Sequence, residues 1–247
     1  MQRLRGPDGL ANPRKDADVQ ASVTSPLLKI CGLMQPQQAA AIAALGVDAI
    51  GVIAVPGSPR FVAHPQRAAL FEAARSSHGG IAAVVVVADP DNSGLAQLGP
   101  GQGHDVVQLH GSETPERCRQ LRRQLPGTQL WKALRIRTPA DLEQARAYRD
   151  CVDAVLLDAW VEGVLGGTGK RLPHEWLTAF DPGLPWWLAG GMNPDNTAAV
   201  LKTLQPSGID ASSGVEHSPG DKDLRRVAAL LAAVRAARQD RDPSPAC

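Results

Sequence analysis

The feature that most constrains the fold is a regular alternation of short apolar runs with helix-like segments. The runs are rich in β-branched residues, which is typical of strands that helices cover on both faces. Most of them end at a polar residue or a glycine. The expected strands are Leu27–Cys31, Ala49–Ala54, Ile81–Val87, Val106–His110, Gln129–Leu134, Ala154–Asp158, Trp186–Ala189 and Gly208–Asp210.

Helix-like segments lie between these strands. Eight strands that alternate with helices predict an α/β fold, a single (β/α)8 TIM barrel with a parallel eight-stranded core. The length of 247 residues suits such a barrel. A doubly wound open sheet is the alternative, but it needs fewer strands or a second domain that no linker marks. The expected helices are 36–45, 65–76, 114–124, 139–148, 194–203 and 222–237, with weaker signals near 92–98 and 173–180.

The ends of the chain differ from its middle. Residues 1–25 are polar, with glycine, proline and mixed charge, and we expect a flexible N-terminal extension there. Residues 26–237 form the expected catalytic barrel, and 238–247 a loose C-terminal tail with two prolines. A transit peptide is a weaker interpretation of the extension, because such leaders are poor in acidic residues.

Composition excludes several classes of function. With 26 basic and 25 acidic residues the net charge is +1, so no polycationic surface for nucleic acid is expected. No apolar run is long enough to cross a membrane, and the N-terminus lacks the apolar stretch of a secretory signal. The four cysteines are scattered without a CxxC pair, which favours reduced thiols in a cytoplasmic protein.

Two strand ends carry acid–base candidates, because barrels place their active sites at the carboxyl ends of the strands. Cys31 ends the first strand and Asp158 the sixth. Each also has a structural interpretation, as a small buried thiol and as a capping or paired carboxylate. Lys29 shares a strand face with Cys31, so it must be paired or hydrated inside the barrel, and its charge should favour the thiolate.

Three further residues are candidates for binding a substrate. Arg60 follows the second strand, and its guanidinium suits a carboxylate. His110 shares a strand face with Gln108, and contacts a substrate or has a structural role. Asp210 ends the last strand, where it orients groups of the site or binds loop amides.

Glycine-rich segments follow the last three strands. Glycine lets backbone amides approach an anion closely, and barrels often hold a phosphate after strands seven and eight. A small phosphorylated molecule is therefore the expected ligand. The histidines show no metal-ligand spacing, and a dinucleotide fingerprint is absent, so no metal or cofactor is expected. The phosphate candidates are Gly167, Gly190, Gly191, Ser213 and Gly214.

The order of these motifs resembles the phosphoribosylanthranilate isomerase family of tryptophan biosynthesis, from about Leu27 to Arg235. Singly the motifs are weak, but together they are specific. They stand at Lys29–Gly32, Ser58–Arg60, Gln108–Glu113, Leu156–Asp158, Gly166–Gly169, Leu188–Gly191, Asn193–Asn196, Asp210–Glu216 and Gly220–Asp223.

The resemblance implies a cofactor-independent Amadori rearrangement of N-(5-phosphoribosyl)anthranilate to 1-(2-carboxyphenylamino)-1-deoxyribulose 5-phosphate. It implies that Asp158 is the general acid, Cys31 the general base and Arg60 the ligand of the anthranilate carboxylate. The protein would act as a monomer or a homodimer. Backbone amides near Gly167, Gly191, Ser213 and Gly214 would bind the phosphate.

The sequence departs from the family pattern at two points, and two other functions remain as alternatives. Met34 stands where the family commonly has threonine, so a loop hydroxyl contact is lost. The second strand also lacks the phenylalanines that the family often places there. A related sugar-phosphate enzyme, such as indole-glycerol-phosphate synthase, would need lysines and a glutamate at strand ends. A non-catalytic barrel that binds a phosphorylated metabolite would need neither Cys31 nor Asp158.

Overall fold

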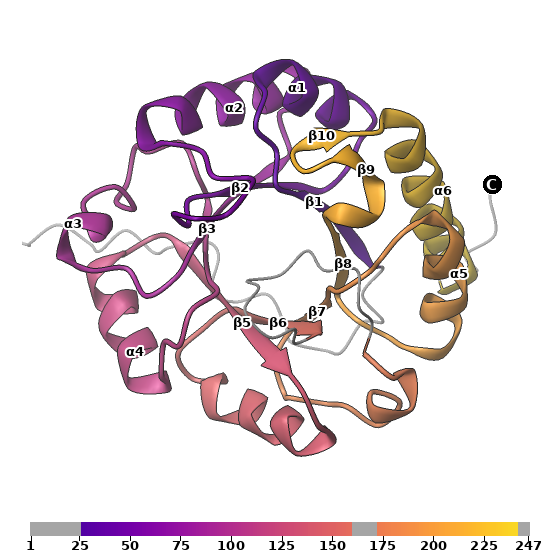
Figure 1. Cartoon of the computed structure of the whole chain (residues 1–247). Coiled ribbons are helices and arrows are strands. Elements are labelled where there is room, and N and C mark those ends of the chain that lie inside the picture. The colour runs from indigo at the N-terminus through magenta and orange to yellow at the C-terminus, as the bar shows by residue number, and fades with distance from the viewer. Residues whose placement is uncertain (1–25, 160–171, 242–247) are drawn as a thin grey trace, which may run out of the picture.

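The computed structural model describes residues 26–159 and 172–241, and they form a closed parallel barrel of eight strands surrounded by helices (Figure 1). The predicted TIM barrel is therefore confirmed. Each strand pairs with its neighbours in chain order, and β8 closes the barrel against β1. The strands are β1 Leu27–Cys31, β2 Ala49–Ile53, β3 Ala82–Val87, β4 Val106–Leu109, β5 Gln129–Ile136, β6 Ala154–Ala159, β7 Trp186–Leu188 and β8 Gly208–Ala211.

The helices lie on the outside of the barrel, where they cover its apolar outer face (Figure 1). None of the described helices is both long enough and apolar enough to cross a membrane. The α-helices are α1 Pro36–Ala44, α2 His64–Ser77, α3 Asn92–Leu95, α4 Pro115–Gln124, α5 Pro194–Thr203 and α6 Leu224–Arg241. The 3₁₀ helices, which have fewer residues per turn, are η1 Pro139–Tyr148, η2 His174–Trp176 and η3 Ser213–Val215.

The barrel interior is apolar at one level and polar at another. Trp131 and Trp187 stack there with ring centroids 4.7 Å apart, among small side chains such as Ala154. The fully buried Lys29 and the nearly buried Gln108 also point inward. The apolar layer supports the barrel, whereas the polar layer supplies groups for chemistry.

Two segments differ from the sequence-based expectation. The segment 139–148 is a 3₁₀ helix, and its buried residues Leu142, Ala145 and Tyr148 recur every third position, which matches the 3₁₀ period. The last helix begins at Leu224 and continues beyond 237 into the expected loose tail, where Arg238 binds Asp48. The termini 1–25 and 242–247 lie outside the described residues.

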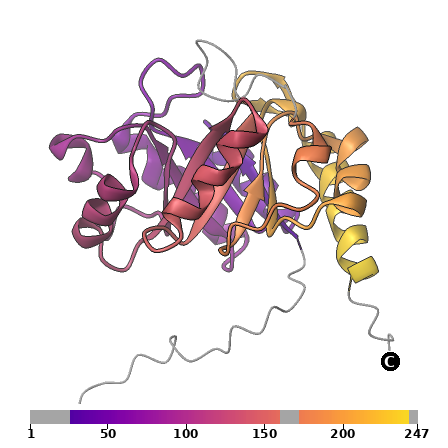
Figure 2. The same ribbon diagram turned by 90° about the horizontal axis from the view of Figure 1, so that it is seen from below.

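A two-stranded hairpin occupies the place where the last helix was expected to begin. Its strands are β9 Glu216–Ser218 and β10 Asp221–Lys222, which pair antiparallel. Gly220 adopts a φ of 84° in the turn, a conformation that glycine accepts at little cost. Figure 2 shows the hairpin and the segment after β2 at the same end of the barrel.

The tryptophan layer predicts a test of barrel packing at Gly208. A Cβ atom there would lie 2.4 Å from the Trp187 ring, so Gly208→Ala should lower the free energy of unfolding by about 1–3 kcal/mol. Urea denaturation measures the change. The control is Gly79→Ala, because no heavy atom lies within 4 Å of its added Cβ. Equal stability of the two variants would show that the ring is not packed against Gly208.

Candidate active site

A cavity at the carboxyl ends of the strands brings together the acid–base and substrate candidates. Cys31 and Asp158 both line it, from β1 and β6. Arg60, His110 and Asp210 line it as well. Side chains that are far apart in the sequence therefore face one space.

The phosphate candidates lie at the same cavity, apart from one that falls outside the described residues. Gly190 and Gly191 line it after β7, and Ser213 and Gly214 after β8. The two loops touch, since a Cβ on Gly214 would lie 2.0 Å from the carbonyl oxygen of Met192. Gly167 belongs to the segment that is not described.

The loop after β7 is held by the start of α5. Asn193 caps the helix by accepting from the amides of Asp195 and Asn196. The Asn196 side chain donates to the carbonyl oxygen of Gly191 at 2.8 Å. Gly190 and Gly191 have φ values of 85° and 65°, which other residues rarely adopt. The loop is thus fixed in a backbone conformation that only glycines accept easily.

Cys31 owes its place to a glycine on the neighbouring strand. Parallel pairing sets Cys31 beside Gly51 of β2, and a Cβ atom on Gly51 would lie 2.7 Å from the sulfur. The thiol therefore fills the space left by a missing side chain. Cys31 is reduced and 5% exposed, at the wall of the cavity.

Lys29 lies beneath the cavity and is paired, as expected. Its ammonium group donates to Gln108 of β4 at 2.9 Å and to Asp210 of β8 at 3.0 Å. Burial alone would lower the pKa of Lys29, but Asp210 and Cys31 raise it above its ordinary value. The buried ammonium therefore remains charged, and it joins three strands across the barrel.

Lys29 favours the Cys31 thiolate, as expected, because it lowers the pKa of the thiol, but the effect of burial outweighs it. Burial raises the pKa of the Cys31 thiol, and the lowering by Lys29 is smaller. Asp210 opposes Lys29 as well, because its negative charge also raises this pKa. The physical reason is that Lys29 is also paired with the Asp210 carboxylate. Its charge therefore stabilises the thiolate by less than burial destabilises it.

A row of polar side chains leads from Asp158 to Lys29. His110 Nε2 lies 3.5 Å from Asp158 Oδ2, and its Nδ1 lies 3.3 Å from the amide nitrogen of Gln108. The oxygen of that amide accepts from Lys29. Gln108 and His110 share one strand face, as the alternation predicted. The row connects the acid candidate with the cation beside the base candidate.

Three buried polar atoms at the cavity make no hydrogen bond to any of the described residues. They are His110 Nε2, Asp210 Oδ1 and Ser212 Oγ. All three residues line the cavity. A buried polar atom without a partner is costly, so these atoms favour a polar ligand.

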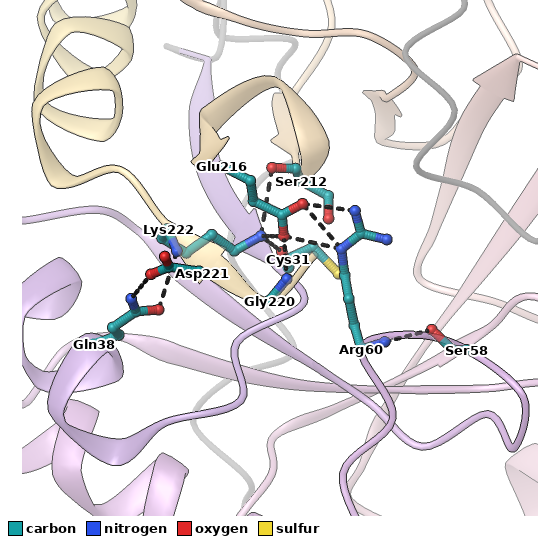
Figure 3. A network of polar contacts seen from close by, with 9 residues as sticks. All are labelled: Cys31, Gln38, Ser58, Arg60, Ser212, Glu216, Gly220, Asp221 and Lys222. Atoms are coloured by element: carbon teal, nitrogen blue, oxygen red, sulfur yellow. Dashed lines mark hydrogen bonds and ion pairs between the residues drawn. The ribbon is translucent and has the colours of Figure 1, made fainter. Parts of the chain in front are cut away.

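Arg60 already binds a carboxylate of the chain itself. Its Nε and Nη2 donate to Glu216 of β9, the Nη2 bond being 2.6 Å long (Figure 3). Lys222 of β10 contacts the same carboxylate at 2.5 Å. The sequence comparison placed Glu216 and Lys222 within family motifs but assigned them no role. The Pro219–Gly220 pair was the available signal for the turn between them.

Met34, the departure from the family pattern, packs against the hairpin. Its sulfur would lie 2.2 Å from a Cβ on Gly220, so the glycine makes room for it. Within the described residues no group of three or more His, Cys, Asp or Glu side chains could hold a metal ion.

Comparisons with known proteins agree with this geometry. The family model described as N-(5'-phosphoribosyl)anthranilate (PRA) isomerase matches residues 28–233. The chain is 52% identical over 204 residues to the N-(5'-phosphoribosyl)anthranilate isomerase of Synechococcus sp. (strain JA-3-3Ab), covering 83% of this chain and 88% of that protein. It is 48% identical over 207 residues to the isomerase of Synechococcus elongatus, covering 84% and 95%.

A solved structure of the same kind superimposes on the barrel. The phosphoribosyl anthranilate isomerase from Thermus thermophilus has a TM-score of 0.71 and 30% identity, with 85% of this chain and 98% of that chain covered. Family model, sequence identity and fold therefore agree over nearly the whole described barrel. The chain belongs to the N-(5'-phosphoribosyl)anthranilate isomerase family.

Proposed function

We propose that this chain isomerises N-(5'-phosphoribosyl)anthranilate in tryptophan biosynthesis, with Asp158 as general acid and Cys31 as general base. The family membership supports the reaction. The assignment of roles rests on one observation, that Cys31 and Asp158 line the same cavity as Arg60 and the glycine loops.

The acid acts first. Asp158 protonates the furanose ring oxygen, the bond from that oxygen to C1 breaks, and the nitrogen lone pair forms the C1=N bond of an iminium ion. His110 Nε2, which makes no hydrogen bond among the described residues and lies 3.5 Å from the Asp158 carboxylate, would orient Asp158 or a sugar hydroxyl.

The base acts second. The Cys31 thiolate takes the proton from C2, the C–H electron pair becomes the C1=C2 bond, and the iminium nitrogen recovers its lone pair. The resulting enolamine becomes the aminoketone when C1 gains a proton and the C2 hydroxyl loses one. The thiol and the carboxylate must then exchange a proton with each other or with solvent before the next turnover.

The cavity is lined by groups suited to both charged parts of the substrate. In this proposal Arg60 binds the anthranilate carboxylate, and its place at the cavity and its planar pair of donors support that role. The adjoining loops at Gly190–Gly191 and Ser213–Gly214, which also line the cavity, bind the phosphate. Asp210 takes a supporting role, since one of its oxygens holds Lys29.

Removing either proton-transfer group should slow chemistry and leave binding intact. Cys31→Ala and Asp158→Asn should each lower kcat by roughly 10²–10⁴-fold. The loss of anthranilate-type fluorescence from freshly prepared substrate, corrected for spontaneous breakdown, measures kcat. Calorimetry with the reduced, non-reacting product should give a near-unchanged Kd. A variant with near-normal kcat would remove that residue from the mechanism.

The raised pKa of Cys31 predicts how its reactivity depends on pH. A thiol of raised pKa stays protonated at pH 7, and only the thiolate is nucleophilic. Alkylation of Cys31 by iodoacetamide should therefore rise about tenfold per pH unit through the ordinary thiol pKa of about 8.5. Cys31→Ser measures the background from the other cysteines. A rate that levels off below pH 8 would contradict the raised pKa.

A further inference from the structure

We propose that Lys222 preserves the affinity of Arg60 for the substrate carboxylate by offsetting the charge of Glu216. In this inference Glu216 and Lys222 are positioning residues that touch no substrate. It rests on the proposed function, in which Arg60 binds the anthranilate carboxylate. The proposal addresses a conflict in the site, since a carboxylate of the chain already occupies part of that guanidinium.

The contacts of Glu216 leave one edge of Arg60 available. Glu216 accepts from Nε at 2.9 Å and from Nη2 at 2.6 Å. Among the described residues Nη1 makes no hydrogen bond, and Figure 3 shows a guanidinium nitrogen pointing away from Glu216. Arg60 also lines the cavity. Glu216 therefore orients the guanidinium, and the edge formed by Nη1 and Nη2 can serve a second carboxylate.

If Glu216 only oriented Arg60, the position where the substrate carboxylate binds would carry no net charge. Arg60 and Glu216 form a pair with no net charge, and the Arg60 and Glu216 side chains are 9% and 4% exposed. A second carboxylate would then meet a neutral pair whose nearest negative charge repels it. Lys222 changes this balance, because its fully buried ammonium lies 2.5 Å from Glu216 Oε1. The three side chains together carry one positive charge.

Burial lowers the pKa of Lys222, whereas the charge and hydrogen bond of Glu216 oppose this shift. The ionisation of Glu216 and Arg60 agrees with the proposed arrangement. Burial alone would raise the pKa of Glu216, yet the bonds from Arg60 and the charge of Lys222 hold it below its ordinary value. Glu216 thus stays ionised, and its hydrogen bonds to Arg60 raise the pKa of the guanidinium. Arg60, Glu216 and Lys222 therefore alternate in charge as positive, negative and positive, and Arg60 is the positive residue that lines the cavity.

Lys222 is held in place by the backbone on both sides. Its ammonium group donates to the carbonyl oxygen of Cys31 and approaches that of Ser212 at 3.4 Å (Figure 3). Its amide donates to Gln38 of α1, whose side chain also donates to Asp221 at 2.7 Å. The hairpin is therefore fixed to helix α1 and to the strand that carries the proposed base.

A comparison of two ligands isolates the carboxylate. One is the reduced product, and the other is the same compound without the ring carboxylate. The ratio of their Kd values, measured by calorimetry, is the carboxylate preference. Loss of fold or of phosphate binding weakens both ligands alike, so it leaves the ratio unchanged.

The charge account predicts a loss and a recovery. Lys222→Met should lower the carboxylate preference about tenfold or more, because the site becomes neutral. The double variant Glu216→Gln with Lys222→Met should regain most of the preference, since Arg60 then supplies the single positive charge. The matched control Lys202→Met removes an exposed lysine of α5 and should leave the ratio unchanged.

Arg60→Met separates this inference from the proposed function. If Arg60→Met lowers the preference and Lys222→Met does not, Lys222 has no such role and the proposed function stands. If Arg60→Met leaves the preference unchanged, the proposed role of Arg60 fails first. A double variant no better than Lys222→Met would also overturn the charge account. Should Lys222→Met fail to fold, Lys222→Gln removes the charge and keeps a donor for Cys31.

Discussion

The site depends on a cation buried inside the barrel. Lys29 has no exposed surface, and its ammonium joins β1 to β4 and β8 through Gln108 and Asp210. A buried charge is tolerated only when it is paired and hydrogen-bonded. The polar layer around it therefore exists as a unit, and that unit sets the positions of His110 and Asp210 at the floor of the cavity.

A second buried cation, Lys222, lies beside Cys31. Lys222 binds the carbonyl oxygen of Cys31, whereas Lys29 interacts with its thiol. Both lysines are balanced by a carboxylate, Asp210 in one case and Glu216 in the other. The positive charges near the sulfur are thus largely neutralised by these two carboxylates. This explains why burial has the largest effect on the pKa of the Cys31 thiol.

The sequence predicted the barrel well because each strand is a local signal. An apolar, β-branched run that ends in a polar residue can be read without knowing its neighbours, and this located Cys31 and Asp158. The hairpin escaped prediction because β9 and β10 are very short and their contacts are distant. Arg60 and Glu216 are bonded across 156 positions, so the sequence suggested a carboxylate partner without revealing that the chain supplies one. Likewise, the sequence showed that Lys29 lies close to Cys31 on one strand face. It did not show how deeply the thiol is buried, and this burial raises the pKa of Cys31 by more than Lys29 lowers it.

The glycine opposite the thiol determines how much room the barrel wall leaves for the side chain of the proposed base. Gly51 is already the smallest residue, and the sulfur of Cys31 occupies the room that its missing Cβ leaves. An aspartate, glutamate or histidine at position 31 could gain no further space from this neighbour. A longer side chain at position 31 would have to extend into the cavity that Cys31 lines. The thiol of the proposed base is small enough to stay within the barrel wall and leave the cavity open.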